Sequence, residues 1–161
     1  MRTDVGMAVA NLHDAFLNAS LVHRLMLATP PDTDPQTAHM SDRFRLERLW
    51  VGLLAVLVEA WDSGQMREAR DSLGGLVSTD RLVSLVRAAR KGEPARRLVA
   101  TRHYMFHRDQ REYWDEGRTA TWGRLDFHME LHDEFGKVLL AGMQALTADP
   151  STDPQTGRKA E

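Results

Sequence analysis

The sequence predicts an all-α fold, a single helical bundle of about five to six helices followed by a disordered C-terminal tail. Apolar residues recur at intervals of three and four along several long stretches, as they do on one face of an α-helix. No stretch alternates apolar and polar residues with the period of a strand. The chain has 161 residues, a usual size for one domain. We therefore expect a bundle domain over residues 1–147 and a polar tail over residues 148–161.

Start and stop signals separate the expected helices. Thr3 is a suitable N-cap for the first helix, and Pro30-Pro31 ends it. Ser41 begins the second helix, whose second half is apolar on most sides and therefore central in the bundle. Gly74-Gly75 ends a short third helix, and Pro94 suits the first turn of a later one. The helices are expected at about 4–28, 41–63, 65–73, 79–91, 94–109 and 125–146.

The composition excludes several classes of protein. Apolar residues make up 42% and charged residues 27% of the chain, as in an ordinary globular domain. The absence of cysteine excludes disulfides, thiolate metal sites and a cysteine nucleophile, and it fits a reducing cytoplasm. Asp4, Asn11 and Asp14 interrupt the stretch in which a signal peptide needs an apolar run. The most apolar segment, residues 49–60, is too short to cross a bilayer. We therefore expect a soluble, cytoplasmic protein that does not engage the membrane.

Positive charge is concentrated in one part of the chain. The net charge is -2, but the segment from Arg81 to Arg111 holds nine Lys/Arg residues against Glu93 and Asp109. This segment therefore carries +7 and the remainder of the chain -9. A basic strip of this kind would guide a phosphate backbone, although arginines that solvate two helices give the same pattern.

The residues with the strongest claim to chemistry lie in the segment Thr101–Gln110. The chain contains no Gly-rich phosphate loop, no GxGxxG, no GxSxG and no HExxH, which disfavours nucleotide hydrolysis, dinucleotide chemistry and acyl transfer. What remains is Arg102, the polar His103 that follows it and, after a short spacer, His107.

This arrangement resembles the HEPN family, whose signature is an arginine, a polar residue, a short spacer and a histidine. The resemblance includes the aromatic Phe106 before the histidine and the position of the motif ahead of the last long helix. Further residues that fit the family are Gln110, Tyr113, Asp115, Trp122, His132 and Phe135. The resemblance implies an endoribonuclease of the toxin–antitoxin or defence type, which forms a homodimer and has an antitoxin as partner.

The chemistry implied by the resemblance needs no metal and no cofactor. The 2′-hydroxyl of RNA attacks the neighbouring phosphorus, and cleavage leaves a 2′,3′-cyclic phosphate and a 5′-hydroxyl. The catalytic residues would be Arg102 and His107. An imidazole titrates near neutral pH and moves a proton, and a guanidinium binds phosphoryl oxygens as charge builds in the transition state. His103, Arg108 and Arg111 are expected to bind the RNA substrate.

The spacing of the two catalytic residues sets a geometric condition. Arg102 and His107 are five positions apart, so on a regular helix their side chains diverge by about 140°. A helix distortion near the motif, or convergence of two motifs across a dimer, would bring them together. The resemblance implies the second solution, in which the active site is shared between two chains.

Two other functions stay open at this point. If Arg102 is an ordinary surface arginine, the same domain would bind RNA, a nucleotide or a protein without turnover. Alternatively, His103 and His107 could join His128 and His132 in a helical metal site, because i,i+4 spacing places both imidazoles of each pair on one helix face. Such pairs are common in helical proteins that hold no metal.

Overall fold

The fold is all-α, as the sequence predicts. A computed structural model describes residues 2–31, 33, 41–91, 98–102, 106 and 125–148, and all regular structure within these ranges is helical. The elements are α1 (Arg2–Ala28), α2 (Asp42–Trp61), the short 3₁₀ helix η2 (Gly64–Met66), α3 (Arg67–Gly74), α4 (Asp80–Ala89) and α7 (Leu125–Thr147). Residues 98–102 are also helical.

Local signals in the sequence fix most of these boundaries. The prediction of Thr3 as N-cap of the first helix is wrong, because α1 begins at Arg2 and Thr3 lies within it. The hydroxyl of Ser41 accepts a hydrogen bond from the backbone N–H of Phe44 at 3.2 Å, which confirms Ser41 as the N-cap of α2. Thr79 occupies the N-cap position of α4, but its side chain makes no capping hydrogen bond. The third predicted helix is divided into η2 and α3. Gly74 is the last residue of α3, close to the expected end.

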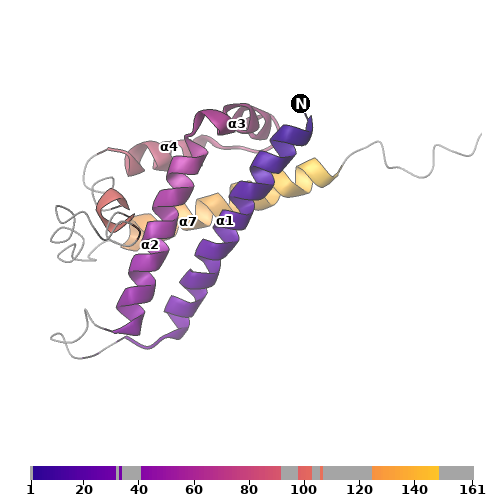
Figure 1. Cartoon of the computed structure of the whole chain (residues 1–161). Helices are drawn as coiled ribbons and strands as arrows, with labels where there is room; N and C mark the ends of the chain where they lie inside the picture. The colour runs from indigo at the N-terminus through magenta and orange to yellow at the C-terminus, as the bar shows by residue number, and fades with distance from the viewer. Residues whose placement is uncertain are drawn as a thin grey trace, which may run out of the picture.

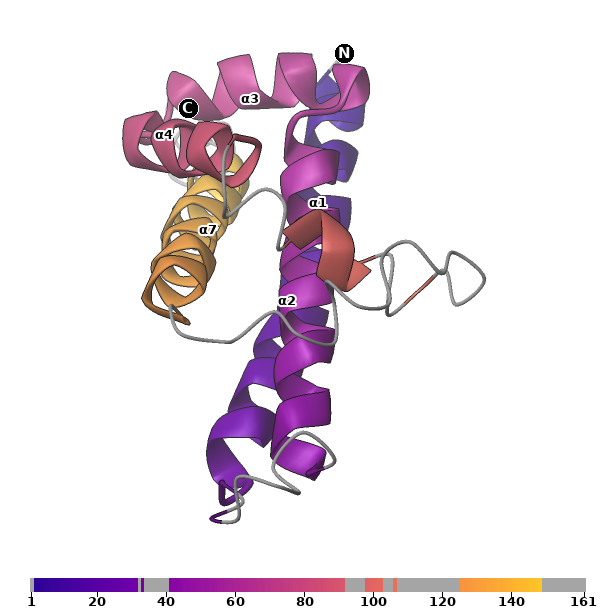
Figure 2. The ribbon, with the colours of Figure 1, turned by 90° about the vertical axis from the view of Figure 1, so that its left-hand side faces the viewer.

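Two long antiparallel helices form the body of the molecule, and a third crosses them. Figure 1 shows α1 and α2 side by side, with α7 running behind both at a steep angle. The shorter α3 and α4 lie together at one end of this arrangement, near the N-terminus of α1 and the C-terminus of α2 (Figures 1 and 2). The crossing brings residues near 20 of α1 next to residues near 132 of α7, far apart in the sequence.

The core lies where α1, α2 and α7 meet. The second half of α2 is buried on nearly all sides, which confirms its predicted central place. The largest fully buried side chains include Trp50 and Trp61 of α2 and Phe135 of α7, and the Trp61 and Phe135 rings meet edge to face at 6.0 Å. Gly142 of α7 lets that helix approach α3 closely, because a Cβ there would collide with the side chain of Leu73.

No helix of the described ranges is long and apolar enough to span a membrane. Ala148 follows α7 outside regular structure, and the rest of the predicted tail, residues 149–161, lies outside the described residues.

Candidate nucleic-acid interface

Arg102, the predicted phosphate-binding arginine, stands at the end of the helical segment 98–102. Leu98, Ala100 and Thr101 of this segment are buried, so they anchor it against the bundle. The guanidinium Nη2 of Arg102 lies 3.1 Å from Oε2 of Glu59 on the last turn of α2. The Arg102 side chain remains 29% exposed. The contact therefore orients the guanidinium while leaving it within reach of solvent.

A second carboxylate, one turn further along α2, binds two more arginines. Asp62 is the C-cap residue of α2. Its Oδ1 accepts a hydrogen bond from Nη1 of Arg70 on α3 at 3.0 Å, and its Oδ2 pairs with Nη1 of Arg90, which directly follows α4. One carboxylate thus joins the C-terminal ends of α2 and α4 to the middle of α3.

These contacts form one group at the C-terminal end of α2, here called the arginine cluster: Arg70, Arg90 and Arg102 with Glu59 and Asp62. Glu59 and Asp62 are three residues apart, so they lie on neighbouring positions of the helix surface. Three guanidinium groups face two carboxylates, which leaves the cluster with a net charge of +1. The negative end of the α2 dipole adds to the attraction between the helix end and the arginines.

A cavity of about 580 Å³ opens beside the arginine cluster, between the end of α2 and the helices α3 and α4. Its size falls in the range of small-ligand sites. Two residues of the cluster, Asp62 and Arg70, lie in its wall, together with Trp61, Asp71, Gly74, Thr79, Val83, Val86 and Arg87. A polar hollow therefore adjoins the Asp62 carboxylate and the Arg70 guanidinium.

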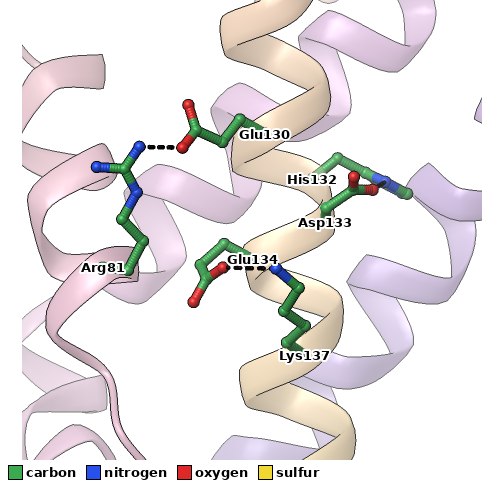
Figure 3. Close-up of polar contacts among 6 residues, drawn as sticks. All are labelled: Arg81, Glu130, His132, Asp133, Glu134 and Lys137. Atoms are coloured by element: carbon green, nitrogen blue, oxygen red, sulfur yellow. Dashed lines mark hydrogen bonds and ion pairs between the residues drawn. The ribbon is translucent and has the colours of Figure 1, made fainter.

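The rest of the described basic strip is partly neutralised. Arg81 of α4 donates to the carboxylate of Glu130 on α7, as Figure 3 shows, and this hydrogen bond raises the pKa of Arg81. Arg87 and Lys91 make no ion pair with the residues that the structure describes. Exposed ion pairs are weak, so Arg81 and Arg90 can exchange a carboxylate for a phosphate.

Only one of the predicted site residues falls in the described part of the chain. Arg102 is placed at the surface, within the arginine cluster. His103, His107, Arg108 and Arg111 lie outside the described residues, as do Trp114 and Trp122. Phe106 is described and is exposed, so the aromatic that precedes His107 is not a core residue.

Comparisons with known proteins give no match: no family model, no curated protein and no solved structure matches this chain.

The histidines of α7 point away from this surface. His128 and His132 are both buried. Nε2 of His132 lies 3.0 Å from Oγ of Ser20 on α1, and its ring stacks on Phe16 at 5.0 Å. In Figure 3 the side chain of His132 extends toward α1, whereas Glu130 extends toward Arg81. The i,i+4 pair on α7 is therefore part of the core.

Another buried histidine, His23 of α1, packs beside His132. We call this group the histidine cluster: His23, His132, Trp50 and Phe16. The His23 ring stacks on the Trp50 indole at 4.5 Å and lies 4.7 Å from the His132 ring. Burial lowers the pKa of both histidines, and the proximity of His132 lowers that of His23 further. Nε2 of His23 has no hydrogen-bond partner among the described residues. These imidazoles are therefore neutral packing groups at pH 7.

The metal hypothesis finds no support in this region. Within the described ranges, no three His, Cys, Asp or Glu residues lie together in a way that could hold a metal ion. Its other two histidines, His103 and His107, lie outside those ranges.

Ser20, His132 and Asp133 follow one another like a serine-hydrolase triad, but the surroundings disfavour that chemistry. Nδ1 of His132 is 3.5 Å from Oδ1 of Asp133, beyond good hydrogen-bond distance. Ser20 lies inside α1, where the backbone N–H groups bond to helix carbonyls and offer no oxyanion hole.

Sequence reasoning missed Glu59 and Asp62 as partners of the arginines. A signal was present, because both carboxylates occupy the C-terminal turn of an expected helix, where the dipole disfavours negative charge. Acids at such a position call for cationic partners. The positions of α3, α4 and the segment 98–102 determine which arginines form ion pairs with these carboxylates.

Proposed function

We propose that this chain is a HEPN-like RNA-binding domain that cleaves RNA without a metal ion. The observation that carries the proposal is the position of Arg102: its guanidinium is oriented by Glu59 and reaches solvent. Glu59 lies one helical turn before Asp62, which binds two more arginines. A homodimer and an antitoxin partner belong to the same proposal, because the family resemblance implies both.

In the proposed reaction, Arg102 exchanges Glu59 for the scissile phosphate and binds its non-bridging oxygens as their charge increases. His107 takes the proton of the 2′-hydroxyl, whose oxygen attacks phosphorus. The 5′-oxygen leaves and gains a proton from water, so the products are a 2′,3′-cyclic phosphate and a 5′-hydroxyl. Arg70 and Arg90 bind neighbouring phosphates of the same strand.

The test compares Arg102→Ala, His107→Ala and Arg45→Ala on a labelled single-stranded RNA in the presence of EDTA. Arg45 is a matched control because it is an exposed arginine paired with Asp42 at 3.4 Å at the opposite end of α2. The first two substitutions should each lower the cleavage rate at least about 100-fold. Arg45→Ala should leave it unchanged. Full cleavage by His107→Ala would remove the catalytic proposal.

A second candidate function, RNA binding without turnover, is favoured by the arginine cluster itself, which is complete without His107. Binding should then weaken with salt, with a log–log slope of about -0.7 per phosphate contact on a single strand. The triple variant Arg70→Ala, Arg90→Ala and Arg102→Ala should reduce that slope by about 2 units. An unchanged slope would exclude the cluster as the binding surface.

A further inference from the structure

The outer face of α1 carries a row of exposed leucines. Leu17, Leu21 and Leu25 are 48%, 50% and 49% exposed, whereas leucine side chains are more often buried in the protein core. They are four residues apart, so they form one stripe along the helix.

This stripe lies opposite the core face of the same helix. At about 100° per residue, Leu21 lies roughly 200° around the helix from Ala19, which is fully buried. Val9, Leu12, His23 and Met26 share the buried side with Ala19. In Figure 1, α7 crosses behind α1, and α2 lies beside it. The leucine stripe therefore lies outside the core of the bundle.

We infer that this face binds the same face of a second copy of the chain, as an antiparallel helix pair. The twofold axis lies on the leucine side of α1, at the level of residue 19 along the helix. With this axis, a residue of one copy lies opposite the residue of the second copy for which the two residue numbers add to 38. It sets Leu17 against Leu21 of the second copy, and Asp14 against Arg24. Ala10 and Ala28 meet near the two ends, where small side chains allow close approach.

Three pairs of positions match under this axis, Leu17 with Leu21, Asp14 with Arg24 and Ala10 with Ala28, whereas Leu25 meets His13. Such matching within one sequence is what a twofold interface requires. Asp14 and Arg24 are both exposed, and neither makes an ion pair with any residue that the structure describes. Antiparallel pairing gives each of them an oppositely charged partner, twice per dimer. Parallel pairing in register would set Asp14 against Asp14 and Arg24 against Arg24.

The inferred contact spans residues 10–28, about 28 Å of helix. It is separate from the arginine cluster, because the segment 98–102 lies on the other side of α2 from α1 in both views (Figures 1 and 2). This pairing is therefore a different interface from the one at which the family resemblance implies that two motifs converge, and it does not rest on RNA cleavage or RNA binding.

Self-association is measured first, by sedimentation velocity of the full chain between about 1 and 200 μM. The wild type should form a dimer as concentration rises. Leu21→Asp should weaken the dimer at least about tenfold while the helical circular dichroism is retained. Leu76→Asp is the control, because Leu76 is equally exposed at 49% but follows α3. A wild type that stays monomeric throughout, or a dimer unaffected by Leu21→Asp, would overturn the inference.

Orientation and register are then tested by disulfide trapping, for which a chain without cysteine is well suited. Asp14→Cys and Arg24→Cys are made as single variants. In the antiparallel pair, like positions are about 15 Å apart and cannot be bridged, whereas position 14 meets position 24. Mild oxidation should therefore cross-link only the mixture of the two variants. Cross-linking of each variant with itself, but not of the mixture, would show a parallel pair and refute the proposed arrangement.

Discussion

The histidine cluster and the arginine cluster both gather nitrogen-rich side chains, but burial gives them opposite properties. His23 and His132 are sealed between α1, α2 and α7, and burial lowers their pKa so that they stay neutral. Arg90 and Arg102 lie at the surface, where each pairs with an exposed carboxylate. Only the second group can exchange a protein partner for a phosphate. The sequence spacing that first draws attention to the histidines says nothing about this difference.

The two clusters should therefore respond differently to substitution. In the histidine cluster, aromatic rings pack closely, so a change mainly alters the free energy of unfolding. In the arginine cluster, ion pairs are partly exposed and each contributes about 1 kcal/mol or less. A change there should mainly alter ligand binding.

Trp50→Ala should give the largest loss of stability. The indole is fully buried and stacks on His23, so its removal leaves a cavity between α1 and α2. The expected cost is about 3–5 kcal/mol in the free energy of unfolding, measured by urea titration. Arg102→Ala serves as the comparison and should change stability by less than about 1 kcal/mol. Equal losses in both variants would contradict the division into a packing cluster and a surface cluster.

Glu47→Gln should stabilise the protein at high pH. Burial raises the pKa of Glu47 to about 7, against the opposing effect of Arg43 and Arg48. Because its pKa is raised, the contribution of Glu47 to stability is fully present below about pH 4.5 and is lost as the pH rises through 7. Removing the ionisable group should therefore add up to about 3 kcal/mol at pH 8 and little at pH 5. Glu68→Gln, at an exposed site on α3, is the control and should keep the wild-type dependence on pH.

His23→Phe should act in the opposite pH range. Because the folded-state pKa of His23 is lowered, the unfolded chain binds more protons in acid, and the wild type loses stability as pH falls below about 6.5. Phenylalanine keeps the stacking on Trp50 and removes this loss, so the variant should gain stability over the wild type at pH 5 and gain less at pH 8. Thermal unfolding of both proteins at pH 5 and pH 8 measures the difference. A larger gain at pH 8 than at pH 5 would show that His23 is not the acid-sensitive group.

Helix boundaries could be predicted because their causes are local. The N-cap at Ser41, the double proline after α1 and the apolar period of α7 each act within a few residues. The direction of the α7 histidines was also readable in principle. His128, Leu131 and Phe135 lie on one stripe, which marks this face as the core side. Their i,i+4 spacing alone shows a shared face but not which face that is.

The arginine cluster could not be assembled from sequence, because its members come from separate elements. Arg102 was singled out by its neighbours in the chain, but its partner Glu59 is 43 positions away on α2. The meeting of Arg70 and Arg90 on Asp62 depends on how α3 and α4 fold back over the end of α2. Side chains that converge through packing leave no period or motif. The one local signal in the sequence was the pair of acidic residues at the C-terminal end of α2, where the helix dipole disfavours negative charge and a cationic partner is therefore expected.

Asp62→Asn should give the smallest loss of stability, and it should strengthen the binding of RNA. The side chains of Asp62 and Arg70 are 34% and 24% exposed, so loss of the charge should cost about 1 kcal/mol or less. The same change raises the net charge of the arginine cluster from +1 to +2 and frees two guanidinium groups, so RNA should bind more tightly at low salt. Asp42→Asn adds the same charge at the far end of α2, next to Arg45, and should change binding less. If both variants bind RNA equally well, only total charge matters. If Asp62→Asn binds more weakly, Asp62 is needed to position the arginines rather than competing with the phosphate for them.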